Sequence, residues 1–277
     1  MKLKKLLDHG FIKEFDKLLV TEFEKDLFVS SLRNYCSHGN PLRFHNFAFS
    51  MRELVLQVID RRAPNEQVKS AVWYTKESDR FEVTRRQKLK FCAQKYISDS
   101  YLDEYTLDDL DESIKEYLKE FNFFNKYTHI TEKHFRACPS KFYDDMKFII
   151  RRSSEVIKDL DVLESSILEK LENGIQERVF EAVINSSPDE LMILAHRVII
   201  DETSPEKLEI EYLEKNGITI GVEGTISITQ EYGKGDDYCE ISNSFPFNVL
   251  VDASVDDPDK IHADTNSLEV DTRSWYE

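Results

Sequence analysis

The spacing of apolar residues predicts helices over the amino-terminal two thirds of the chain. Apolar positions recur every three or four residues, as on one face of an α-helix, over residues 11–31, 42–62, 85–97, 106–128 and 141–173. The clearest apolar stripe lies within residues 42–62 and consists of Phe44, Phe47, Met51, Leu54, Val55, Val58 and Ile59. We therefore expect amphipathic helices that pack their apolar faces together.

The last of these predicted helices, residues 141–173, has a nearly heptad apolar pattern. Such a pattern is typical either of a helix that faces the core of its own domain or of a seam between two protomers. Ser153 and Glu164 interrupt the stripe, which favours the core-facing interpretation. We expect Gly174 to end this helix.

After Ser186, Ser187 and Pro188 the apolar residues begin to alternate with polar ones, as they do in β-strands. Asn216 and Gly217 are typical of a hairpin turn. The expected strands lie at residues 198–200, 208–210, 218–220, 225–228, 245–251 and 268–270. The predicted fold class is therefore α+β, with an all-α region over residues 1–185 and a small β-rich region over residues 186–277.

Charge is distributed unevenly along the chain. Residues 1–100 contain 19 Lys and Arg against 13 Asp and Glu, whereas the remaining residues contain 18 against 40. The net charge of the whole chain is −16, but the local field decides whether a polyanion binds, and the amino-terminal field is positive. Solubility alone explains the acidic excess of the second part but not the basic cluster of the first.

The sequence also indicates a location. It contains no run of about 18 apolar residues, so we expect no membrane span. Its start lacks the continuous apolar stretch of a secretory signal. The four cysteines, Cys36, Cys92, Cys138 and Cys239, are widely separated, as is typical of reduced thiols. We therefore expect a cytoplasmic protein.

Arg33 and His38 form the sharpest short motif. An Arg, a polar residue after it and a His five positions later resemble the RxxxxH motif of HEPN ribonucleases, whose Arg and His line a cleft, usually between two protomers. RNA cleavage by its own 2′-hydroxyl needs a group that moves a proton and a fixed cation beside the phosphate, and needs no metal. Alternatively, both residues only complement the negative end of a helix that stops at Gly39.

Lys126 and His129 form a second candidate pair, within residues 125–130. This segment resembles the last helix of degenerate HEPN domains, in which the Arg is replaced. HEPN domains place their motif after several helices, which favours this pair, because only one predicted helix precedes Arg33. The alternative is a buried His that caps a turn.

A third signal is a group of basic residues, interleaved with aromatic ones, between residues 43 and 90. Phosphates favour such clusters, and aromatic rings offer stacking surfaces to bases. A solvated helix face is the alternative interpretation. The candidate nucleic-acid-binding residues are Arg43, Arg52, Arg61, Arg62, Trp73, Arg85, Arg86 and Lys88.

Signals for other enzyme classes are weak. The chain has no P-loop and no HExxH motif. Glu209 and Glu211 alternate on a predicted strand but lack the Lys two residues later that a PD-(D/E)xK nuclease requires. Carboxylates such as Asp236, Asp237 and Glu240 could hold a metal ion. We expect neither a cofactor nor a bound metal.

Longer segments resemble the family of predicted pPIWI-associating nucleases. They include NPLRFHNFAFSMREL (40–54), TRRQK (84–88), NKYTHI (125–130), EGTISITQEYGKGDD (223–237) and VDTRSWYE (270–277). The resemblance implies a role in defence against invading nucleic acid, beside prokaryotic Argonaute-like genes. The matching candidates for a site are Arg33, His38, Arg52, Glu53, Arg86, Lys126 and His129.

These observations lead to three hypotheses. The first is a metal-independent, HEPN-type endoribonuclease, in which His38 or His129 moves the proton and Arg33 or Lys126 holds the phosphate. RNA is then the expected substrate rather than DNA, and a homo-oligomer is expected. The second is a non-catalytic adaptor or sensor that binds nucleic acid or a protein partner from the same defence operon. The third is a metal-dependent DNase.

Overall fold

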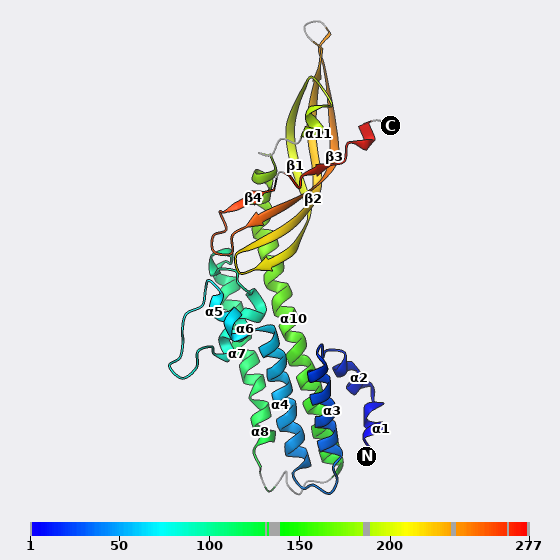
Figure 1. Cartoon of the computed structure of the whole chain (residues 1–277), viewed down its shortest axis with the longest axis vertical. Coiled ribbons are helices and arrows are strands. Elements are labelled where there is room, and N and C mark those ends of the chain that lie inside the picture. The colour runs from blue at the N-terminus through cyan, green and yellow to red at the C-terminus, as the bar shows by residue number, and fades with distance from the viewer. Residues whose placement is uncertain are drawn as a thin grey trace. The chain divides into compact units, whose positions relative to one another are not determined.

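The structure, a computed structural model, describes residues 2–130, 132, 139–184, 189–233, 237–264 and 266–275 (Figure 1). Its helices are α1 (Leu3–Leu7), α2 (Gly10–Asp16), α3 (Glu22–Cys36), α4 (Arg43–Arg62), α5 (Asn65–Ser70), α6 (Arg85–Gln94), α7 (Glu104–Phe121), α8 (Phe123–Thr128), α10 (Pro139–Ile184) and α11 (Asp189–Met192). Its strands are β1 (Arg197–Glu214), β2 (Gly217–Tyr232), β3 (Cys239–Ala253), β4 (Ile261–Ala263) and β5 (Glu269–Val270). The α+β prediction is confirmed.

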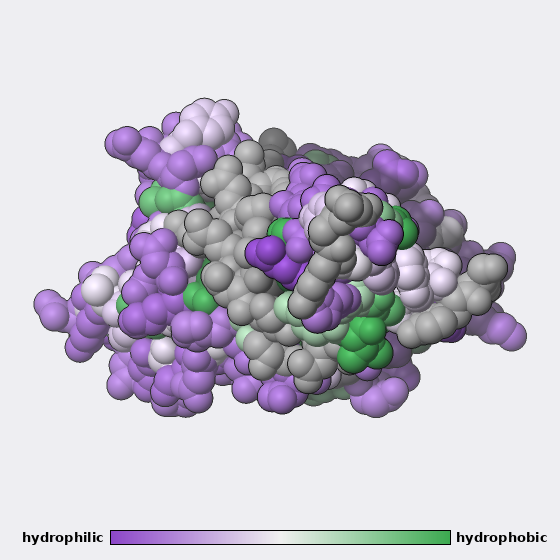
Figure 2. Space-filling model, turned by 90° about the horizontal axis from the view of Figure 1, so that it is seen from above, coloured by the Kyte–Doolittle hydropathy of each residue, from purple (hydrophilic) through white to green (hydrophobic). Residues whose placement is uncertain are grey.

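The chain divides into two compact units. The first is helical and comprises Met1–Lys69, Tyr74–Gln94 and Tyr105–Ser166. The second contains the sheet and comprises Ser70–Trp73, Lys95–Glu104 and Ile167–Glu277. Helix α10 contributes residues to both units. The face drawn in Figure 2 is mainly hydrophilic, as expected for a chain in which 32% of residues are charged.

A capping box divides the predicted helix over residues 11–31 into α2 and α3. The Thr21 hydroxyl accepts a hydrogen bond from the backbone of Glu24 at 3.1 Å, and the Glu24 carboxylate accepts one from the backbone of Thr21 at 3.3 Å. These bonds satisfy free N–H groups at the start of a helix and fix that start at Glu22. The prediction of one continuous helix was therefore wrong.

Helix α4 agrees with the prediction of an amphipathic helix over residues 42–62. All seven residues of its apolar stripe are buried. On its first turn, the ring of Phe44 stacks on the ring of Phe142 in α10, with centroids 5.1 Å apart and planes 4° apart. This contact joins the amino-terminal ends of α4 and α10.

Helix α10 passes through Gly174, so the predicted end at this residue was wrong. A glycine inside a helix costs only about 1 kcal/mol relative to alanine, which a long helix tolerates. Met146, Ile150, Ser153, Ile157 and Leu160 are buried within the chain. Over this part of α10, the nearly heptad stripe therefore faces the core of its own unit.

The sheet is antiparallel, in the order β1-β2-β3-β4, and β5 also pairs with β3. The predicted hairpin is confirmed, because Glu214 pairs with Gly217. Its turn consists of Lys215 and Asn216, one position before the predicted pair Asn216 and Gly217. The segments 198–200 and 208–210, predicted as separate strands, belong to one strand with irregularities in register. An extra residue at a bulge shifts the alternation of side chains, which explains the apparent break in the sequence pattern.

One face of the sheet forms the core of the second unit. On β2 and β3 it buries alternate apolar residues, against Leu191 and Leu194 near α11. Ile97 comes from the short segment Lys95–Glu104 and is fully buried in the same core. The backbone N–H of Ser98 donates to the carbonyl oxygen of Val255 at 2.8 Å, which attaches this segment to the end of β3.

We expect Gly224→Ala to lower the free energy of unfolding of the second unit by about 2 kcal/mol. A Cβ at this position would lie 2.4 Å from the carbonyl oxygen of Ser204 and 2.9 Å from Cα of Pro205, and backbone atoms cannot move away easily. Urea denaturation followed by circular dichroism measures the effect. The control is Gly10→Ala, whose Cβ would have no atom within 4 Å; equal midpoints for both variants would contradict this account.

Glu24→Gln tests the ion pair that connects α3 to α4. Glu24 Oε1 lies 2.6 Å from Nε of Arg61, and the Glu24 side chain is only 3% exposed. Burial raises the pKa of Glu24, but hydrogen bonds from Arg61 and from the backbone of Val20 and Thr21 outweigh it and hold this pKa below its usual value. Because the folded pKa is lowered, the stabilisation is present at neutral pH and is lost as the pH falls through that pKa.

We therefore expect Glu24→Gln to lower the free energy of unfolding by about 2 kcal/mol at neutral pH. The difference from the wild type should shrink below about pH 4.3, where an unfolded Glu takes up its proton. Urea denaturation at neutral pH and near pH 3 measures both effects. Glu14→Gln, at an exposed position of α2, is the control; a Glu24→Gln effect independent of pH would disprove the ionic explanation.

Candidate functional site

The loop between α3 and α4 brings His38 and Arg43 together. It is held by its own hydrogen bonds: the backbone of Asn40 donates to the carbonyl oxygen of Ser37 at 2.9 Å, and that of Leu42 donates to Oδ1 of Asn40 at 2.9 Å. Nη1 of Arg43 lies 2.6 Å from Nδ1 of His38. The imidazole is exposed and the guanidinium half-exposed, so both groups are accessible to a ligand.

Aromatic rings and a backbone carbonyl fix the guanidinium of Arg43. Nη1 donates to the carbonyl oxygen of Tyr35 at 3.3 Å. The carbon of the guanidinium lies 5.6 Å from the centre of the Tyr35 ring and 5.4 Å from the centre of the Phe142 ring. No carboxylate lies within 4.0 Å of this guanidinium in the part of the chain that the structure describes.

The groups nearest to Arg43 do not neutralise its charge. Burial raises the pKa of Tyr35 to about 12, so its phenol is uncharged at neutral pH. Burial also raises the pKa of the Cys36 thiol. The end of α3 therefore presents uncharged groups to the guanidinium, which keeps its positive charge available for an anion.

The structure joins His38 to Arg43, although the sequence motif pairs it with Arg33. Arg33 is exposed on the last turn of α3. Sequence reasoning had placed Arg43 in the binding surface and missed its contact with His38. The only signal in the sequence is the short loop between them, because a connection of this length keeps the end of α3 near the start of α4.

The second candidate pair lies on α8. The backbone of His129 ends this helix by donating to the carbonyl oxygen of Asn125 at 3.2 Å, and its side chain is exposed. Lys126 lies in α8, but its side chain is outside the described part of the structure. Figure 1 shows the end of α8 and the α3–α4 loop at the same end of the helical unit. Among the described contacts, no hydrogen bond joins His129 to His38 or Arg43.

Most residues of the predicted basic surface form ion pairs. Their partners are acidic residues of α3, α4, α7, α10 and the segment before α6, at 2.5–2.9 Å. The pairs are Arg52 with Glu53, Arg61 with Glu24, Arg62 with Asp161, Arg86 with Glu77 and Asp111, and Lys88 with Asp60. A paired cation contributes little to the local field, so this surface is less attractive to a polyanion than its sequence indicates.

Two further residues of that surface have other contacts. The guanidinium of Arg85 lies 5.1 Å from the centre of the Phe121 ring, and its side chain is exposed. Trp73 is half-buried and donates from Nε1 to the carbonyl oxygen of Lys95 at 2.9 Å. Arg85 therefore presents an exposed cation, whereas the indole N–H of Trp73 is already used in a backbone hydrogen bond.

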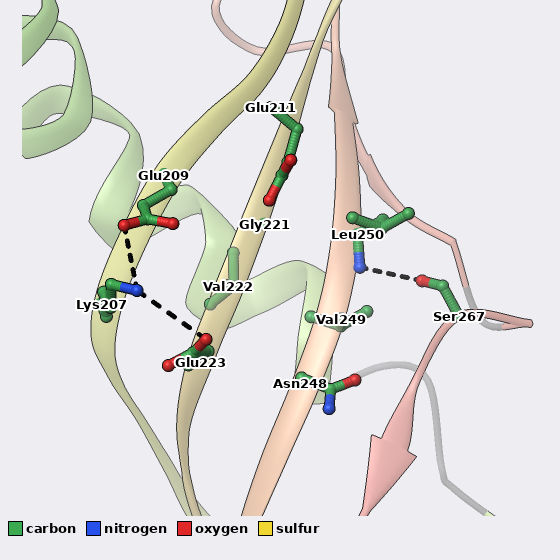
Figure 3. Close-up of a pocket in the computed structure, with 10 residues that line it drawn as sticks. All are labelled: Lys207, Glu209, Glu211, Gly221, Val222, Glu223, Asn248, Val249, Leu250 and Ser267. Carbon is green, nitrogen blue, oxygen red and sulfur yellow. Dashed lines mark hydrogen bonds and ion pairs between the residues drawn. The ribbon is translucent and has the colours of Figure 1, made fainter.

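A hollow of about 240 Å³ lies on the sheet, beside Gly221 (Figure 3). Nζ of Lys207 lies 2.9 Å from Glu209 and 3.9 Å from Glu223, so one cation is shared by two carboxylates. Glu211 adds a third carboxylate to the lining. This excess of negative charge opposes the binding of a phosphate.

The described residues contain no group of three or more His, Cys, Asp or Glu side chains placed to hold a metal ion. Asp237 and Glu240 are described, whereas Asp236 lies outside the described residues. Within the described residues, no helix has the length and apolar character needed to cross a bilayer.

Comparison with known proteins identifies a family. Two family models match, both with the description "Predicted pPIWI-associating nuclease"; one matches residues 16–158 and the other residues 160–276. No curated protein and no solved structure matches the chain. Because the two models together span nearly the whole sequence, the chain belongs to the family of predicted pPIWI-associating nucleases.

Proposed function

We propose that the chain is a metal-independent endoribonuclease of a prokaryotic defence system, with His38 and Arg43 as catalytic residues. The observation that supports this most is the 2.6 Å contact between Arg43 Nη1 and His38 Nδ1 on an accessible loop. An imidazole can move a proton, and a guanidinium without a carboxylate partner can bind a phosphate. Membership of a family of predicted nucleases agrees with this chemistry.

The hydrogen bond between the two side chains defines the starting state of the reaction. An arginine N–H can only donate, so Nδ1 of His38 accepts, and the proton of the neutral ring lies on Nε2. When a phosphate binds, the N–H group of Arg43 that donates to His38 donates to a phosphate oxygen instead, while the guanidinium stays against the Tyr35 and Phe142 rings. Arg43 then no longer donates to Nδ1. Arg43 is then both the anion-binding group and the group that releases the base.

The proposed reaction uses the 2′-hydroxyl of RNA as its nucleophile. Nδ1 of His38 takes the proton from this hydroxyl, and the oxygen attacks the adjacent phosphorus. The bond from phosphorus to the 5′-oxygen breaks, and this oxygen receives a proton from the imidazolium or from water. The products are a 2′,3′-cyclic phosphate and a free 5′-hydroxyl, and Arg43 stabilises the negative charge that develops on the phosphate.

A second candidate function is non-catalytic binding, as an adaptor or sensor of nucleic acid or of a partner from the same operon. The same hydrogen bond favours it, because Nδ1 cannot act as a base while it accepts from Arg43. Salt-dependent RNA binding by the purified protein, together with intact RNA after long incubation, would support this function over cleavage.

The decisive experiment incubates the full chain with single-stranded RNA in the presence of a chelator. We expect cleavage to continue and to leave 2′,3′-cyclic phosphate ends, because the proposed groups need no metal. His38→Gln and Arg43→Lys should each lower the rate by about 100-fold or more. A DNA strand of the same sequence should resist, since it lacks the nucleophile.

Lys215→Gln is the matched control, because it removes an exposed cation from the β1–β2 turn. Activity that disappears with the chelator and returns with magnesium would contradict the mechanism. A larger loss in Arg33→Gln than in Arg43→Lys would assign the phosphate-binding role to Arg33 instead.

A further inference from the structure

A second group of aromatic and basic side chains lies where the α1–α2 junction meets the first turns of α10. The ring of His9 lies 5.7 Å from the ring of Phe11 and 6.1 Å from the ring of Tyr143. Nζ of Lys147 lies 5.8 Å from the centre of the Phe11 ring. We call these four residues the aromatic subsite.

All four side chains of the aromatic subsite are partly accessible. Each is half-buried, so each is held by packing while part of it meets solvent. In the described residues, no carboxylate lies within 4.0 Å of Lys147. Its charge therefore remains available, in contrast to Lys88 and Arg86, which form ion pairs.

The aromatic subsite adjoins the His38–Arg43 pair. Phe142 lies beside the guanidinium of Arg43, and the next residue along α10, Tyr143, lies beside His9. Consecutive side chains on a helix point about 100° apart, so Phe142 and Tyr143 place the two groups on adjoining faces of the first turn of α10. Both groups therefore lie around the first turns of α10, and the ribbon shows α2 near α10 (Figure 1).

We propose that the aromatic subsite binds nucleotides of a single-stranded polynucleotide, next to the phosphate that Arg43 holds. Unpaired bases stack on the exposed parts of Tyr143, His9 and Phe11, and Lys147 contacts the neighbouring phosphate. A duplex cannot use this subsite, because its base faces are already stacked on each other. This proposal takes from the proposed function that the chain binds a polynucleotide, but it does not require that the chain cleaves it.

The test measures the affinity of the full chain for short fluorescent oligonucleotides by anisotropy, in a His38→Gln background that prevents cleavage. The probes are single-stranded RNA, single-stranded DNA of the same sequence and the corresponding duplex. Tyr143→Leu should weaken single-strand binding by about 10-fold, because leucine keeps apolar volume but offers no stacking surface. Lys147→Gln should reduce the slope of log affinity against log salt by about 0.7.

Two control variants lie on the same helix. Phe148→Leu removes an aromatic ring that is 49% exposed, and Lys158→Gln removes an exposed cation. Neither residue belongs to the aromatic subsite, so neither variant should change the affinity. Circular dichroism establishes that the variants are folded, and if Tyr143→Leu does not fold, Lys147→Gln decides the question by its salt slope.

The proposal would be overturned if folded Tyr143→Leu and Lys147→Gln had the same affinity and the same salt slope as the parent His38→Gln protein. Equal affinity for the duplex and the single strand would overturn it as well. Losses confined to these two variants, together with a wild-type chain that cuts no RNA, would support the aromatic subsite while contradicting the catalytic function. Equal losses for the RNA and DNA probes would support recognition of bases and phosphates rather than of the 2′-hydroxyl.

Discussion

The contact of Phe142 with both Phe44 and Arg43 is the interaction on which the candidate site depends. Stacking on Phe44 holds the amino-terminal turn of α4 against α10, and the same ring borders the guanidinium of Arg43. Each contact is worth only about 1 kcal/mol. Their importance for function lies in position. Through Phe142, helix α10, which is distant in sequence, holds the guanidinium of Arg43 in place on the first turn of α4, next to the α3–α4 loop.

Charge pairing decides where the helical unit can attract an anion. Among the basic residues of α4 and α6 that the sequence predicts to bind phosphate, Arg61, Arg62 and Arg86 form ion pairs with carboxylates from α3, α10 and α7. Arg43 and Lys147 lie next to aromatic rings instead. A count of charges along the chain cannot separate these cases, because the partners of Arg61, Arg62 and Arg86 come from other helices and are set only by folding.

The fold could be predicted from sequence where a single local pattern dominates. The stripe of α4 and the β1–β2 hairpin are such cases, since a helical period and a turn dipeptide act within a few residues. The break before α3 was also visible in principle, because Thr21 and Glu24 have the spacing of a capping box. Apolar residues such as Leu18 and Leu19 continued the helical period across that break and concealed it.

The site was less predictable than the fold, for a geometric reason. The RxxxxH motif pairs His38 with Arg33, which is near it in sequence, whereas His38 lies beyond the end of α3 and meets Arg43, the first residue of α4. Likewise, the bulges of β1 disturbed the alternation that would have indicated one long strand. In both cases the missing information is the path of the backbone outside regular structure, which residue types constrain only weakly.

The discontinuity of the second unit has a consequence for synthesis on the ribosome. All segments of the helical unit have been translated by Ser166, whereas the core around Ile97 also needs strands that end at Ala253 and beyond. A domain folds as a unit, so it can complete its core only after its last segment has left the ribosome. During synthesis, residues 95–104 therefore remain unpacked and Ile97 stays exposed to solvent while more than half of the chain is translated.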